Sequence, residues 1–140
     1  RVMEVQTAFC EPAGELPEWK AARASGGGVL LDLGSHHMDL VRWIVGRETV
    51  AVQATLASAR SEHDSARVRL DLGEGVEAQC VFSFRASRVD VIQVVGETGL
   101  LRADRLLPPL KVWTTPGARP GLRQQRVLRD LEPDGPATAT

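Results

Sequence analysis

The sequence predicts an α+β fold in which an open, mostly antiparallel sheet has one long helix packed on it. Two patterns lead to this class. From Gly28 to Val45, apolar residues recur at the spacing of an amphipathic helix. Before and after this stretch, apolar and polar residues alternate with a period of two, which is typical of strands. A chain of 140 residues, 43% of them hydrophobic, is long enough to bury the core of one domain.

The predicted strands lie on both sides of the helix in the chain. They are residues 2–10, 50–56, 66–72, 76–84 and 89–95, with shorter runs at 100–103 and 110–113. The glycines of Gly73-Glu74-Gly75 predict a hairpin, and four consecutive strands after the helix predict a meander. In 66–72, apolar residues alternate with charged ones, so we expect the helix to cover one face and solvent the other.

The segments between these elements carry turn signals. Residues 11–25 contain Pro12, Gly14 and Pro17, so they are expected to form an irregular crossing with one short helical turn. Gly46 stands where a left-handed residue would end the helix. The pattern weakens after residue 106. We therefore expect one domain over residues 1–131, with 132–140 as a tail or linker.

Charge and cysteine usage limit the function classes. The formal net charge is −1 with both signs interspersed, which excludes the basic stripe expected for binding nucleic acid or a membrane surface. No stretch of about 18 apolar residues predicts a membrane span. Cys10 and Cys80 lie far apart in predicted strands, so two buried free thiols and a cytoplasmic location are expected. Small molecules and proteins remain as partners.

One face of the predicted helix collects ionisable side chains. Asp32, His36, Asp39 and Trp43 are spaced so that they fall along one stripe. Imidazole titrates near neutral pH and is therefore suited to general acid–base catalysis. A carboxylate one helical turn away, as Asp32 is from His36, can hold one tautomer of the ring and stabilise its protonated form. The stripe predicts a catalytic or binding face.

The carboxylates of this stripe also have structural interpretations. Asp32 is close to the start of the helix, where the helix dipole stabilises a negative charge. Asp39 could form an ion pair with Arg42 or Arg23, which would contribute little to stability.

Neighbouring residues are expected to be structural. His37 lies about 100° around the helix from His36, so we expect it to be a hydrogen-bonded core histidine. Trp19 and Trp43 are expected to pack against other residues rather than to stack on a ligand. We predict no metal site, because Asp32 and His36 supply two ligands without a third.

The stretch from Gly26 to Gly46 resembles the C-terminal domain of the Gfo/Idh/MocA family of NAD(P)-dependent oxidoreductases. That family has a helix of pattern Gly-Gly-Gly, apolar, Asp-x-Gly-x-His-x-x-Asp that ends in Gly. The matching positions here are Gly26, Gly27, Gly28, Asp32, Gly34, His36, Asp39 and Gly46. The turn Gly96-Glu97-Thr98-Gly99 is also similar to one in the family. The resemblance extends over about residues 1–104.

The resemblance implies specific roles for the stripe. His36 would be the acid–base residue that removes the hydroxyl proton of an alcohol substrate. Asp32 would orient His36 or bind a sugar hydroxyl, and Asp39 would complete the substrate-binding set. In such enzymes an N-terminal Rossmann domain holds NAD or NADP.

The cofactor half is not found in this sequence. It has no Gly-x-Gly-x-x-Gly after a strand and no Glu-Lys-Pro, and the run from Gly26 to Gly28 lacks the spacing of a phosphate cradle. We therefore expect the chain to be part of a longer polypeptide, to bind no dinucleotide tightly and to be inactive alone.

Together these observations predict the substrate-binding and dimerisation domain of an oxidoreductase that acts on a sugar, cyclitol or related polyol. An open sheet face exposes apolar area unless a partner covers it, so we expect a homodimer through that face. The alternative is a non-catalytic binding or assembly module of the same fold, because a fold does not by itself establish an activity.

Overall fold

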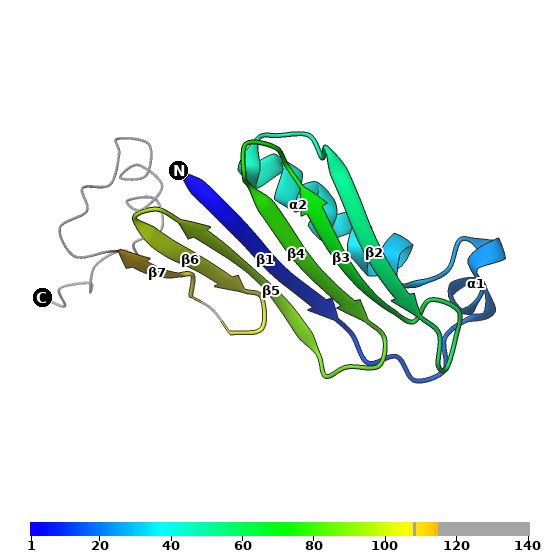
Figure 1. The fold of residues 1–140 in the computed structure, drawn as a ribbon. Helices are drawn as coiled ribbons and strands as arrows, with labels where there is room; N and C mark the ends of the chain where they lie inside the picture. Colours follow the sequence, from blue (N-terminus) through cyan, green and yellow to red (C-terminus); the bar gives the residue numbers. More distant parts are fainter. Residues whose placement is uncertain (108, 115–140) are drawn as a thin grey trace, which may run out of the picture.

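A computed structural model describes residues 1–107 and 109–114 (Figure 1). Its seven strands form one sheet in the order β2-β3-β4-β1-β5-β6-β7. The strands are β1 Val2–Cys10, β2 Ala51–Ala57, β3 Ser65–Asp71, β4 Glu77–Ser83, β5 Val89–Gly96, β6 Gly99–Asp104 and β7 Lys111–Thr114. The α-helices are α1 Glu18–Ala21 and α2 Ser35–Val45. The predicted class is confirmed. The expected boundary at residue 131 and the tail 132–140 lie outside the described residues.

The first strand lies at the centre of the sheet. β1 pairs in parallel with β4 and antiparallel with β5, and all the other pairs are antiparallel. The sheet is thus mostly antiparallel, as predicted. The predicted meander of four consecutive strands is wrong at one point, because β1 lies between β4 and β5 in the sheet. Hydrogen bonding along both edges of β1 places Val5 in the core with no exposed surface.

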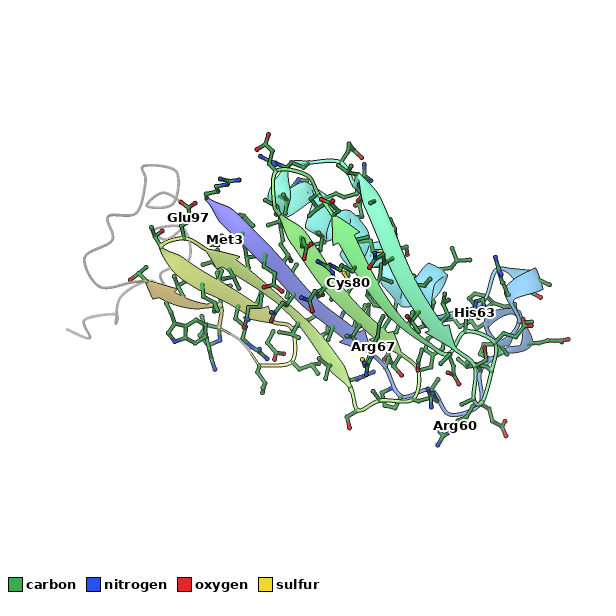
Figure 2. All side chains as sticks on the ribbon, viewed as in Figure 1. Met3, Arg60, His63, Arg67, Cys80 and Glu97 are labelled. Carbon is green, nitrogen blue, oxygen red and sulfur yellow. The ribbon has the colours of Figure 1, made fainter. Side chains whose placement is uncertain are left out.

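The core lies between α2 and one face of the sheet. Figure 1 shows α2 behind the strands, and it contacts β1 and β4. In β3, apolar residues that are buried alternate with exposed charged ones, as predicted. The core also takes residues from β1, β4 and the helical region; its largest fully buried members include Val5, Val29, Val41, Leu72, Cys80 and Phe82. In the view of Figure 2, Arg67 belongs to the opposite face, where β3 exposes its charged residues.

The predicted long helix is present but not uniform. A π-helical segment, Leu30–Gly34, leads into α2, and the Ser35 N–H donates to the Leu30 carbonyl. Gly34 allows the close approach there, since a Cβ would lie 3.3 Å from the Phe82 ring. α2 ends at Gly46, whose φ is +70° and whose N–H donates to the Arg42 carbonyl, as predicted.

The segment between β1 and the helix contains the expected short helical turn. α1 is followed by a 3₁₀ turn, Arg23–Ser25. Trp19 and Trp43, expected to pack against other residues, are both exposed. Trp19 contacts the Lys20 ammonium, and Trp43 is 78% exposed. α1 is a single turn, and α2 buries only the face that meets the sheet. No helix in the described ranges is long and apolar enough to cross a membrane.

Both cysteines are buried and free, as predicted. Burial raises the pKa of the Cys80 thiol to about 11 and also raises that of Cys10. A thiol with such a pKa is almost entirely protonated at neutral pH, and the protonated form is a poor nucleophile. The two thiols therefore behave as apolar core groups.

His37 is a hydrogen-bonded core residue, as predicted. Its Nδ1 is hydrogen-bonded to the Thr7 hydroxyl, and its Nε2 lies 3.1 Å from Asp90 Oδ1. The ring stacks on Phe9 with centroids 5.0 Å apart. Burial lowers the pKa of His37, and the opposing effect of Asp90 is too small to reverse this. The ring is therefore neutral at pH 7 in the folded protein.

This burial predicts a loss of stability in mild acid. The unfolded chain takes up a proton near pH 6.5 that folded His37 does not bind, so the free energy of unfolding falls as the pH drops below 6.5. The fall ends once the pH reaches the lowered pKa of the folded state. In His37→Gln this component is absent, and at pH 7.5 the variant is about 1–3 kcal/mol less stable because Asp90 and Thr7 lose a buried partner.

Urea denaturation followed by circular dichroism between pH 5 and pH 8 measures both effects. His36→Gln is the matched control, because it removes the exposed neighbouring imidazole and leaves the burial of His37, the main cause of its lowered pKa, in place. If the free energy of unfolding changed equally with pH in wild type and in His37→Gln, buried His37 would not be the source of the pH dependence.

Candidate functional site

Asp32 is held by a residue that sequence reasoning did not select. Lys20 Nζ lies 2.8 Å from Asp32 Oδ2, and the two side chains are 28% and 27% exposed. Lys20 comes from α1, and Asp32 from the π-helical segment. The available signal was a predicted helical turn with a lysine six residues before the first of three glycines. The partner itself could not be read from sequence, because the two residues belong to different local elements.

The three glycines bring these elements together. The N–H of Gly28 donates to the Lys20 carbonyl at 3.1 Å, and that of Gly27 donates to the Ala22 carbonyl at 3.0 Å. A Cβ on Gly27 would lie 2.4 Å from the Lys20 carbonyl oxygen, so no other residue fits there. Gly28 has a φ of +102°, a conformation that favours glycine. The glycine run therefore docks α1 against the beginning of the helix.

A second segment, residues 58–64, supports the same region. Figure 2 shows His63 at the end of the molecule that carries α1, and its carbonyl accepts the Val29 N–H at 2.9 Å. The Glu62 N–H donates to the Ala21 carbonyl at 3.1 Å, and Glu62 Oε2 accepts the Arg23 N–H at 2.6 Å. Backbone and side-chain contacts from residues 58–64 thus hold both the α1 region and the start of the helix.

Asp64 holds this supporting segment in shape. Its buried carboxylate accepts N–H groups from Ala59, Arg60 and Ser61, and Arg85 Nε lies 3.0 Å from Oδ1. Burial alone would raise the pKa of Asp64, but the three N–H donors and the Arg85 charge together lower it. Asp64 therefore remains ionised and fastens the loop at neutral pH.

His36 lies exposed on α2, on the side away from buried His37. Across residues 1–107 and 109–114 no ion pair joins His36 to Asp32 or Asp39. The direct contact by which Asp32 would orient His36 is thus not present in this structure. Asp39 is also exposed, and its Oδ1 lies 3.8 Å from Arg42, one of the two ion-pair partners considered from the sequence. The imidazole of His36 is accessible to a ligand.

A cavity of about 250 Å³ lies beside α2, which contributes His37 and Leu40 to its lining. Asp90 contacts two of the side chains that line the cavity: Oδ1 faces His37, and Oδ2 lies 2.5 Å from Arg105 Nε. The cavity is lined by His37, Leu40, Asp90, Ile92, Ala103, Asp104, Arg105 and Leu110. None of the predicted site residues lines it. In the described part of the chain, no three His, Cys, Asp or Glu side chains gather as metal ligands would.

Comparison with known proteins identifies relatives of this chain. Residues 1–102 match the sequence profile of the GFO/IDH/MocA C-terminal domain. The rhizopine catabolism protein MocA of Rhizobium meliloti is 30% identical over 108 residues, which are 71% of this chain and 34% of MocA.

Solved structures agree with this match. GenD2 from gentamicin A biosynthesis, in complex with NAD, is 31% identical with a TM-score of 0.66, over 74% of this chain and 31% of GenD2. The WlbA dehydrogenase from Bordetella pertussis, in complex with NADH and UDP-GlcNAcA, has the same fold at 22% identity, with a TM-score of 0.68 over 86% of this chain and 40% of WlbA.

The chain spans about a third of the length of these relatives. The profile match extends from β1 into β6 and includes the glycine run, Asp32 and His36. The sheet with one covering helix and the glycine-framed pattern agree with it. The chain belongs to the GFO/IDH/MocA C-terminal domain family.

Proposed function

We propose that this chain is the substrate-binding and dimerisation domain of an NAD(P)-dependent oxidoreductase that oxidises or reduces a sugar, cyclitol or related polyol. The observation that carries the proposal is the arrangement at the start of the helix. An accessible imidazole, His36, follows a carboxylate, Asp32, that is fixed by Lys20. The complexes of GenD2 with NAD and of WlbA with NADH and UDP-GlcNAcA support the class of cofactor and substrate.

The residues described here do not fit the dinucleotide itself. A phosphate cradle needs free backbone N–H groups. The N–H groups of Gly26, Gly27 and Gly28 already donate to the carbonyls of Arg23, Ala22 and Lys20. We therefore assign the cofactor to a Rossmann domain N-terminal to this one in a longer chain. Two buried free thiols support a cytoplasmic location.

The part of the reaction that these residues can perform is proton transfer and substrate orientation. An alcohol carbon becomes a carbonyl only if its hydroxyl proton leaves, and the His36 imidazole is the base we assign to that proton. Asp32 would accept a hydrogen bond from a substrate hydroxyl. Asp39, exposed one helical turn beyond His36, would bind a second hydroxyl.

Substitution of His36 tests this assignment. In the full-length protein, His36→Ala should lower kcat for the polyol by about 10²–10⁴-fold, because the proton loses its acceptor. Cofactor affinity should stay within about twofold of wild type, since His36 belongs to a domain without a dinucleotide site. Steady-state kinetics and NADH fluorescence titration measure the two quantities.

His63→Asn is the matched control. It removes another imidazole of the same domain at a residue with a φ of +50°, which asparagine also adopts, and turnover should stay near wild type. Wild-type turnover in His36→Ala would contradict a catalytic role for His36 and favour the alternative, a non-catalytic binding or assembly module.

We further propose that a second copy of the chain covers the open face of the sheet. Within the described residues no helix lies on this face (Figure 1). A row of polar side chains crosses it in register, one from each strand: Gln53, Arg69, Gln79, Gln6, Gln93, Arg102 and Lys111. Apolar side chains flank the row, including Val81 and Trp113, both exposed. Such a mixed, flat face is suited to an isologous contact.

Val81→Arg should weaken this dimer at least about tenfold in Kd, because two-fold symmetry buries the new charge twice. Val52→Arg is the matched control: Val52 is also an exposed strand valine, at 59% against 40% for Val81, but it lies on the helix-covered side. Analytical ultracentrifugation of both variants measures the association. An unchanged dimer in Val81→Arg, or a monomeric wild type, would contradict the proposed interface.

A further inference from the structure

The contact between Lys20 and Asp32 is more elaborately built than a surface ion pair. The Lys20 N–H donates to the Pro17 carbonyl at 2.9 Å, and its own carbonyl accepts the Gly28 N–H at 3.1 Å. Its ammonium also lies 5.2 Å from the centroid of the Trp19 ring. The backbone of Lys20 is therefore fixed on both sides of the residue.

Stability alone does not account for this construction. Partly exposed ion pairs contribute little to the free energy of unfolding. Here the pair depends on a position, Gly27, where any Cβ would lie 2.4 Å from the Lys20 carbonyl oxygen. The supporting residues 58–64 also attach next to Lys20, through the Ala21 carbonyl. These contacts fix the position of the lysine relative to the helix.

The pair leaves hydrogen-bonding capacity on both partners. Lys20 contacts Asp32 through Oδ2, and the described residues provide no hydrogen bond to Oδ1. An ammonium has three N–H donors, of which the carboxylate takes one. A carboxylate held through one oxygen presents the other as an acceptor with a fixed direction, which is what orientation of a substrate hydroxyl requires.

We propose that Lys20 is a positioning residue of the site: its ammonium fixes the Asp32 carboxylate so that Oδ1 accepts a hydrogen bond from a hydroxyl of the polyol. The three glycines, Gly26 to Gly28, let α1 dock closely enough for Lys20 to reach Asp32. The proposal rests on the proposed function, because it gives Lys20 a role through Asp32 in the same reaction.

Kinetics of variants in the full-length protein test the role. With the best substrate from a panel of myo-inositol, D-glucose and UDP-N-acetylglucosamine, Lys20→Met should lower kcat/KM by about 10–100-fold, chiefly through KM for the polyol. KM for the dinucleotide should not change. Lys20→Arg keeps the charge and donors and should recover kcat/KM to within about fivefold of wild type.

A second pair of variants separates positioning from direct contact. Gly27→Ala leaves both side chains intact but displaces the Lys20 backbone, so it should reproduce the Lys20→Met kinetics. Gly14→Ala is the matched control, because a Cβ there meets nothing within 4 Å and activity should be unchanged. If Gly27→Ala does not fold, the comparison of Lys20→Met with Lys20→Arg still tests the positioning role of Lys20.

A labelling experiment needs no activity. Reductive methylation followed by mass spectrometry compares Lys20 with the exposed Lys111, and Lys20 should react several-fold more slowly until Asp32→Asn releases it. Equal methylation rates for Lys20 and Lys111 in wild type would contradict the ion pair between Lys20 and Asp32. Slow labelling of Lys20 with wild-type kinetics in Lys20→Met would overturn the positioning role. Absence of turnover with any polyol in wild type, with Lys20 still slow to label, would count against the proposed function instead.

Discussion

The hydrogen bonds of buried His37 determine how α2 is rotated against the sheet. Thr7 from β1 and Asp90 from β5 hold opposite sides of the ring, and Phe9 packs along its face. Successive residues of a helix point about 100° apart, so burial of His37 directs His36 away from the core. The exposed histidine of the candidate site therefore owes its orientation to the buried one. A core polar network and the proposed chemistry depend on the same two adjacent residues.

A second level of organisation fixes the beginning of the helix. The glycine run allows α1 to approach closely, residues 58–64 support the contact, and Asp64 secures that support with three N–H donors. Lys20 and Asp32 meet where these segments converge. Glycine in such a run is often associated with phosphate binding, but here the amides are already occupied by backbone carbonyls. The same residue type serves close backbone packing instead.

Local pattern was sufficient for much of the fold. Periodicity placed the seven strands and the helix, Gly46 marked the helix end, and the 100° offset identified His37 as a core residue. Long-range pairing was not accessible from the same information. The insertion of β1 between β4 and β5 depends on partners about 70–90 residues away. The link from Lys20 to Asp32 and the exposure of Trp19 and Trp43 likewise depend on how separate elements meet, which periodicity does not describe.

The central place of β1 has a consequence for how the chain folds. Val5 pairs with Ala78 on one side and with Val94 on the other. β1 precedes the other strands of the sheet in the chain, so it must wait until both neighbours have left the ribosome, and closing such long loops is costly in entropy. Topologies dominated by distant contacts fold slowly compared with helical bundles. During synthesis the hairpin of β3 and β4 can form early, whereas the completed sheet belongs to the final stage of folding.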